Sequence, residues 1–442
     1  MALELKTTGT YSGPSMVSRP PLPDGAVGYA DFLGTAHQVT PAASTLGPLT
    51  NSVVNRDNFV AGLYYGKTGL ALGRQYYLDR IEHDGAGRPL GLRISGAWTQ
   101  LVTAAQRFSL SAGTATGASV SASGTATDAW AQWWQVTATG DAAAHLSVST
   151  SNSAANNYVI VAWDVRREGS SRFVQIGSLT GGAQFWANFD LDTGVAASTG
   201  TGVTAGVIER PGRVATVYML ARLPAAVTSV DAYVAPVPAA NAAKLASSAT
   251  GASVVARTPI VRHSTTLDGM VVPHAVHTTG TSTRNSDLPT SGASMPSGAA
   301  NFSVVSMIRT RSEAIQGNSG LAFLFPVNGD TGNQAPFIEF RFASDFSLNI
   351  VYNFARQHTF KAVFKPGTVY RYGLTRRGSL LTVVFGDESV TLDTGTYGLG
   401  TCSLWRGKDA AASMLNGFAQ RAIWWAEACS AAELRSRVDR YL

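Results

Sequence analysis

The chain repeatedly alternates apolar and polar residues, and the clearest case lies between residues 185 and 192. Four apolar residues alternate there with four others: Phe185, Ala187, Phe189 and Leu191 with Trp186, Asn188, Asp190 and Asp192. Successive side chains of a strand point to opposite faces of its sheet, so this pattern predicts a strand with one apolar and one polar face. Because a one-residue slip would bury Asn188 and Asp190, the apolar face defines the register.

Alternating runs of this kind, separated by turn residues, cover most of the chain, which has 442 residues, 45 glycines and only 14% charged residues. This composition favours an all-β protein over a helical one, and the length favours two or three domains. We therefore expect two tandem antiparallel β-sandwiches with an irregular N-terminal segment and a short C-terminal helix. The expected domains are residues 1–95, 96–257 and 258–442.

The short helix is expected near the C-terminus, where Ser430 and Glu433 precede an apolar stripe. In a capping box, the serine side chain caps the first turn and the glutamate reaches back to the cap residue. Leu434, Val438 and Tyr441 then share one face of the helix. We expect α-helix to be almost confined to this segment.

Two parts of the chain resemble known families. The runs YVIVAWDV at 158–165, FVQI at 173–176 and ANFDLDTG at 187–194 resemble, in this order, the sugar-binding-type β-sandwich of many bacteriophage virion proteins. The C-terminal run from Asn416-Gly417 through AIWW to the Ser430 cap resembles the end of laminin-G-like, concanavalin-A-like jelly rolls. The resemblances cover residues 100–250 and 258–442. They imply fibre or adhesin modules of jelly-roll type that bind sugars, bind proteins or act as inert structural units.

Residues 1–95 differ from the rest of the chain. Prolines at positions 14, 20, 21, 23, 41 and 48 break their first half into extended or looped segments, and little here predicts a large independent core. Two interpretations remain open: a small irregular domain, or an attachment segment that becomes ordered on a larger assembly. Fibre proteins commonly carry their virion anchor at the N-terminus, so the phage resemblance favours attachment.

Five residues are candidates for a carbohydrate site. Trp186, Asn188 and Asp190 lie on the polar face of their strand, where an indole can stack on a sugar while the amide and carboxylate bind its hydroxyls. A subunit contact would cover the same indole. Trp133 and Trp134 must point in opposite directions if they lie in a strand. They either form a stacking platform for sugars or pack between sandwiches or subunits.

Other features argue against several classes of function. The formal net charge is +6, but the basic residues are scattered, which argues against nucleic-acid binding and still suits an anionic polysaccharide. No secretory signal and no membrane-spanning apolar run is recognisable. Cys402 and Cys429 are either bridged or free and buried, with the free thiols favoured. No complete ligand set for a metal is recognisable, so neither a metal nor another cofactor is expected.

A glycoside hydrolase needs two convergent carboxylates, whereas the candidate acids are more typical of turns and solvent-exposed faces: Asp190, Asp192, Glu339, Asp387 and Glu388. We therefore expect a non-enzymatic structural protein of a bacteriophage particle, such as a fibre, spike or decoration subunit, assembled in the bacterial cytoplasm. Its expected partners are other virion proteins through the N-terminal segment, further copies of the chain with a trimer favoured, and a host-surface polysaccharide. A polysaccharide-degrading tail enzyme and a non-virion surface adhesin are the alternatives.

Overall fold

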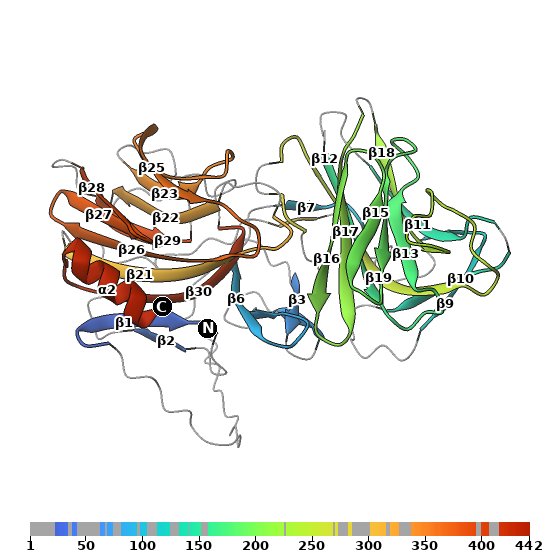
Figure 1. Cartoon of the computed structure of the whole chain (residues 1–442), viewed down its shortest axis with the longest axis horizontal. Helices are drawn as coiled ribbons and strands as arrows, with labels where there is room; N and C mark the ends of the chain where they lie inside the picture. The colour runs from blue at the N-terminus through green and yellow to red at the C-terminus, as the bar shows by residue number, and fades with distance from the viewer. Residues whose placement is uncertain are drawn as a thin grey trace, which may run out of the picture.

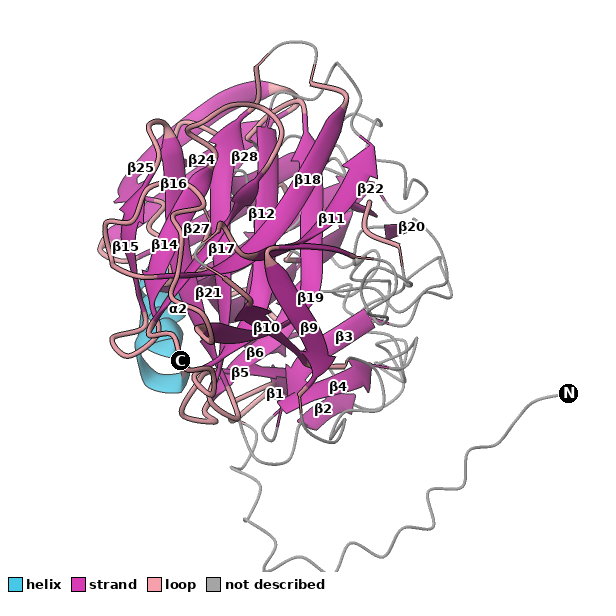
Figure 2. Cartoon of the chain, turned by 90° about the vertical axis from the view of Figure 1, so that its right-hand side faces the viewer, coloured by secondary structure: helices cyan, strands magenta, loops and turns pink. Residues whose placement is uncertain are grey.

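In the computed structural model of the chain, antiparallel strands form two layered units that lie side by side (Figure 1). The structure describes residues 23–33, 38–41, 62–66, 69–73, 81–94, 98–103, 113–123, 132–140, 142–151, 158–224, 227–267, 270–272, 282–284, 301–314, 319–326, 337–394, 399–405 and 415–442. Within these ranges α2 (Ala431–Tyr441) is the one α-helix (Figure 2). The expected all-β fold with a short C-terminal helix is therefore confirmed. No helix in the described ranges has the length and apolar character needed to cross a membrane.

The first β-sandwich consists of two six-stranded antiparallel sheets. Its strands are β8 (Thr114–Thr116), β9 (Ala118–Ala122), β10 (Trp134–Ala138), β11 (His145–Ser151), β12 (Tyr158–Arg166), β13 (Phe173–Ser178), β14 (Trp186–Asp190), β15 (Val195–Thr199), β16 (Val203–Arg210), β17 (Val214–Arg222), β18 (Ser229–Val237) and β19 (Ser253–Ser264). One sheet has the order β15-β14-β13-β18-β11-β8, and the other has the order β16-β17-β12-β19-β10-β9.

The core of the first sandwich lies between these sheets, as the alternation predicts. All four apolar residues of the 185–192 run are buried in it, namely Phe185, Ala187, Phe189 and Leu191. β13 and β14 are antiparallel neighbours, with Phe173 opposite Asp190 and Gly177 opposite Trp186, which confirms the strand predicted at 185–192. β19 continues to Ser264, so the expected domain boundary at residue 257 falls inside a strand of the first sandwich.

The second sandwich consists of a nine-stranded and a five-stranded sheet. The larger sheet contains β1 (Ala26–Asp31), β2 (Gln38–Pro41), β5 (Ile81–His83), β6 (Pro89–Ile94), β21 (Asn301–Thr310), β26 (Val369–Arg377), β27 (Leu380–Phe385), β28 (Glu388–Asp393) and β30 (Gly417–Trp425). The smaller sheet contains β22 (Ser319–Pro326), β23 (Ile338–Phe342), β24 (Ser347–Tyr352), β25 (Ala355–Val363) and β29 (Leu399–Leu404). Two separate ribbons pair β3 (Gly62–Gly66) with β4 (Gly69–Gly73) and β7 (Trp98–Gln100) with β20 (Ser282–Arg284).

Described segments of residues 1–95 complete the second sandwich. Along one edge of β30, β6 pairs with Gly417–Ala419 and β1 pairs with Arg421–Trp425. The N-terminal region also contributes to the second core through Ala30, Phe32, Ile81, Leu92 and Ile94. The structure therefore differs from the expected boundary at residue 95, because this part of the chain buries its apolar residues against strands that lie more than 200 positions later. An attachment role for the N-terminal region stays a prediction.

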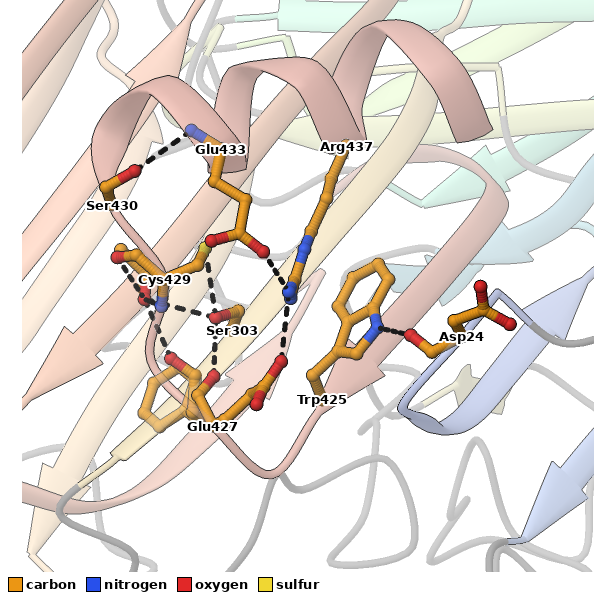
Figure 3. Close-up of polar contacts among 10 residues, drawn as sticks. Asp24, Ser303, Trp425, Glu427, Cys429, Ser430, Glu433 and Arg437 are labelled. Carbon is orange, nitrogen blue, oxygen red and sulfur yellow. Dashed lines mark hydrogen bonds and ion pairs between the residues drawn. The ribbon is translucent and has the colours of Figure 1, made fainter.

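The helix α2 covers the outer face of the nine-stranded sheet, where Leu434 and Val438 are buried against Trp425 and its neighbours. Ser430 caps the helix, since its hydroxyl accepts a hydrogen bond from the Glu433 backbone N–H. The Glu433 carboxylate pairs with Arg437 (Figure 3). The guanidinium of Arg437 lies 4.3 Å from the centre of the Trp425 ring.

The indole N–H of Trp425 donates to the carbonyl of Asp24, at 3.1 Å (Figure 3). The last strand therefore holds both the C-terminal helix and the segment before β1. Cys429 is buried beside this helix, whereas Cys402 is buried in the core between the sheets. Both are free thiols, as expected, and burial raises the pKa of Cys402 to about 12.

Candidate functional site

Trp133 and Trp134, two of the candidates for a carbohydrate site, are buried. Trp134 belongs to the core of the first sandwich. Trp133 is 1% exposed, and the guanidinium carbons of Arg166 and Arg257 each lie 4.1 Å from the centre of its ring. Arginine packs well on an indole face because the ring quadrupole attracts the cation. The expectation that one of these rings is available for sugar stacking is wrong, since protein groups already cover both.

The predicted polar face of β14 is buried too. Asn188 is 0% exposed, and its amide nitrogen donates to the carbonyls of Ala240 and Ala242 at 3.2 and 2.8 Å. Its carbonyl oxygen accepts from the Gln175 side chain at 2.7 Å. The chain between residues 239 and 248, which follows β18, therefore occupies the place that we expected a sugar to take. Trp186, beside it, is half-buried.

A second amide on the same face extends this network. The carbonyl oxygen of Gln175 accepts from the Tyr233 hydroxyl at 2.8 Å and from the backbone N–H of Leu245 at 2.7 Å, while its nitrogen donates to the carbonyl of Ala243 at 3.0 Å. Buried polar groups need such partners, because each one left unsatisfied costs about 1–3 kcal/mol. These amides therefore bind a loop of their own chain.

Asp190 is taken up by an ion pair. The guanidinium of Arg172 donates to both carboxylate oxygens, at 2.6 and 3.0 Å. This pairing holds the pKa of Asp190 well below its usual range. The neighbouring Asp192 lies 3.3 Å from the same guanidinium. The Asp190 carboxylate also accepts from the backbone N–H of Asp192 at 2.9 Å, so it closes the turn that follows β14.

The structure places a different polar site where the two sandwiches meet. A cavity of about 380 Å³ is lined by Gly85 from the β5–β6 turn and by residues of the first sandwich: Arg167, Glu168, Glu209, Arg210 and Arg213. We call it the junction pocket. Figure 1 shows β6 in the region between the two sandwiches. Arg210 is the last residue of β16.

A buried carboxylate lies beneath the junction pocket. Glu82 of β5 is 0% exposed; its two oxygens lie 2.5 Å from Arg93 Nη1 and 3.3 Å from Arg210 Nη1. Burial alone would raise the pKa of Glu82, but attraction to Arg93 and Arg210 outweighs it and lowers the pKa from 4.5 to about 2. Because Arg93 belongs to the second sandwich and Arg210 to the first, this carboxylate joins them.

From Arg210 a chain of polar contacts crosses the outer face of the first sandwich. Arg210 Nε donates to the Thr216 hydroxyl at 3.1 Å, and this hydroxyl donates to Asp164 at 2.8 Å. Asp164 lies 3.5 Å from the guanidinium of Arg257, which covers Trp133. These residues sit on neighbouring strands and are paired across the sheet, which a linear sequence does not display. No local pattern in the sequence indicates this site.

The rim of the junction pocket depends on two glycines. Arg167 Nη2 and Glu209 Oε1 are 2.9 Å apart. A Cβ atom on Gly194 would lie 2.5 Å from Glu209 Oε1, and one on Gly85 would lie 2.9 Å from Glu209 Cβ.

Arg213, in the turn between β16 and β17, has a left-handed backbone with φ of 59°. Within the described ranges it makes neither a hydrogen bond nor an ion pair.

The remaining candidate acids lie in the second sandwich. Glu339 is buried and lies 3.5 Å from Arg341, and Glu388 accepts from the backbone N–H of Lys361 at 2.9 Å. The backbone carbonyl of Asp387 accepts from Arg435 at 2.9 Å. The described part of the chain contains no group of three or more histidine, cysteine, aspartate or glutamate side chains placed to hold a metal ion.

Comparisons with known proteins identify no family for this chain. No family model and no curated protein sequence matches it. The solved structures that align with it include domains LG4-5 of the mouse laminin alpha1 chain, with 10% identity, 66% of this chain and 90% of that chain covered, and a TM-score of 0.20. The tandem CBM22-1-CBM22-2 domain of Paenibacillus barcinonensis Xyn10C aligns with 11% identity, 76% and 97% coverage, and a TM-score of 0.25.

The LG1-3 region of the laminin alpha2 chain aligns with 10% identity, 66% and 61% coverage, and a TM-score of 0.18. Alignments of this quality carry no argument about function. The assignment of two β-sandwiches rests on the strand pairing within this chain.

Proposed function

We propose that the protein is a non-enzymatic structural subunit of a bacteriophage particle, whose two joined sandwiches are displayed as one unit and bind a glycan of the host surface. The observation that carries the proposal is the junction itself. Glu82 pairs with arginines of both sandwiches while fully buried. A displayed module has to transmit force and hold its binding surface in place, and a buried, interlocked junction serves both needs.

The motifs that resemble phage virion modules support the same function. FVQI lies in β13 and ANFD lies in β14, and these two strands are antiparallel neighbours in one sheet of the first sandwich. We further propose that contact with other virion proteins involves the N-terminal region and that the subunit forms a homo-oligomer, with a trimer favoured. The paired strands β1, β2, β5 and β6 would then connect that contact directly to the second sandwich.

Particle composition tests the proposal. Phage particles released from a host that carries the gene are purified on a density gradient and analysed by mass spectrometry, with immunogold labelling to locate the protein. We expect it in the particle at a fixed copy number that is a multiple of the oligomer size. Its absence from washed particles, when it is present in the same lysate, contradicts the proposal. Release of new reducing ends from host polysaccharide by the purified protein contradicts the non-enzymatic part.

A further inference from the structure

We propose that the junction pocket binds an acidic saccharide and that Arg213 pairs with its carboxylate. This inference rests on the proposed function, because it names the class of glycan and the place where it binds. The cavity of about 380 Å³ falls within the range of about 300–1,000 Å³ that is typical of small-molecule pockets. The side chains of Glu168 and Glu209 on its rim are 54% and 51% exposed, so the pocket is accessible from solvent.

The charges around the pocket favour an anion. Each of the three glutamates already has an arginine partner: Glu82 pairs with Arg93 and Arg210, Glu168 with Arg166, and Glu209 with Arg167. Arg213 has no partner within the described residues, and the lining as a whole carries three arginines against two glutamates, one positive charge in excess. A guanidinium can donate two parallel hydrogen bonds to a carboxylate, which suits an acidic sugar better than a neutral one.

The backbone of Arg213 has an unusual conformation for a residue with a side chain. Its φ of 59° lies in the left-handed region, which costs a residue with a side chain about 1–2 kcal/mol. Strained residues of this kind gather at ligand sites, where the surrounding structure maintains them. Pro211, at the start of this turn, is buried, whereas Gly212 and Arg213 are exposed. The turn therefore presents a guanidinium to the pocket, and the rim carboxylates of Glu168 and Glu209 can accept hydrogen bonds from sugar hydroxyls.

Calorimetric titration with a matched pair of ligands tests the inference. The full-length protein is titrated with trigalacturonic acid and with its methyl ester, which keeps the rings and hydroxyls but removes the charge. Low ionic strength is used, because salt screens exposed charges. We expect the acid to bind at least about tenfold more tightly than the ester, as a charge-assisted hydrogen-bonded pair is lost in the ester.

Substitutions then locate the site. Arg213→Ala should weaken binding of the acid by about tenfold or more, since charged hydrogen bonds are the strong ones. Arg213→Gly removes the same guanidinium while relieving the backbone strain, so it should fold at least as well and lose the same affinity. The control is Arg222→Ala. Arg222 is exposed at the other end of β17, about 26 Å along the strand, and its removal should leave binding unchanged.

Equal binding of acid and ester, no binding of the acid, or unchanged binding by both Arg213 variants overturns the inference. None of these results affects the proposed function if purified particles contain the protein. Conversely, absence from the particles overturns the proposed function whether or not the saccharide binds.

Discussion

At the scale of single residues, two amide side chains bind the backbone of the chain itself, and one of them is Asn188, which we expected to face a ligand. Asn188 and Gln175 present donors and acceptors on one face of the sheet, as sugar-binding amides do, but the backbone of residues 239–248 takes up those groups. A peptide and a saccharide offer similar hydrogen-bonding partners, so the same side chains suit either. The role of the two amides is therefore to hold the loop on the sheet.

Replacing Asn188 should consequently affect stability. Asn188→Ala leaves the carbonyls of Ala240 and Ala242 without this donor in a buried site, and we expect the free energy of unfolding to fall by about 1–3 kcal/mol. Denaturant unfolding followed by fluorescence measures the change. Asn241→Ala is the control, since Asn241 is an exposed amide of the same loop and should change the value by less than about 0.5 kcal/mol. Equal effects of both substitutions would show that the buried network contributes nothing.

At the scale of elements, β30 organises the second sandwich. It pairs with β21 along one edge, and with β6 and β1 in succession along the other. Gly91 makes the contact with β6 possible, because its φ is 124° and a Cβ there would lie 2.5 Å from the carbonyl oxygen of Ala419. Only glycine combines that conformation with so close an approach.

A methyl group at position 91 should therefore separate these strands. We expect Gly91→Ala to lower the free energy of unfolding by more than about 2 kcal/mol, from backbone strain together with the clash. Hydrogen exchange should show faster exchange in β6 and in Gly417–Ala419. The matched control is Gly140→Ala, since a Cβ at Gly140 meets no atom within 4 Å. Unchanged protection in Gly91→Ala would mean that β6 does not depend on this contact.

At the scale of the whole molecule, a few buried charges connect the two sandwiches. Glu82 has no contact with water and relies on Arg93 and Arg210. Removing one member of a buried ion pair leaves the other charges uncompensated, which is far more costly than removing an exposed pair. The junction is therefore the place where one substitution acts on both halves of the chain.

Glu82→Gln tests the role of this buried charge, because the substitution removes the charge and keeps the shape of the side chain. At neutral pH we expect the free energy of unfolding to fall by about 3–5 kcal/mol. The native pKa of Glu82 is about 2, below its ordinary value of 4.5, so the ionised side chain stabilises the fold above pH 4.5 and loses this effect as the pH falls toward 2. The difference between wild type and variant should therefore shrink across that window.

The comparison for this experiment is Glu209→Gln at the exposed rim of the same junction. Its side chain is 51% exposed, so its removal should cost less than about 1 kcal/mol. A Glu82→Gln variant that is as stable as wild type at neutral pH would contradict the assigned role of Glu82. So would a difference that does not depend on pH.

Local patterns in the sequence were sufficient to predict strand β14 and helix α2. Alternation predicted the core face of β14, and the spacing of Ser430, Leu434 and Val438 predicted α2, because both depend on residues a few positions apart. The composition was likewise sufficient for the all-β class. Side-chain direction in a strand or helix follows from local geometry, so such features need no knowledge of distant partners.

Partners far apart in the sequence were decided only by the tertiary structure. Alternation showed that Asn188 lies opposite the core, but whether water, a sugar or a loop covers it depended on residues 239–248. The N-terminal strands have few apolar residues of their own to form a core, and their partner β30 lies more than 300 residues away. The ion pair between Glu82 and Arg210 joins residues of different sandwiches. Burial and ion pairing depend on what surrounds a side chain in space, and only the folded chain brings these groups together.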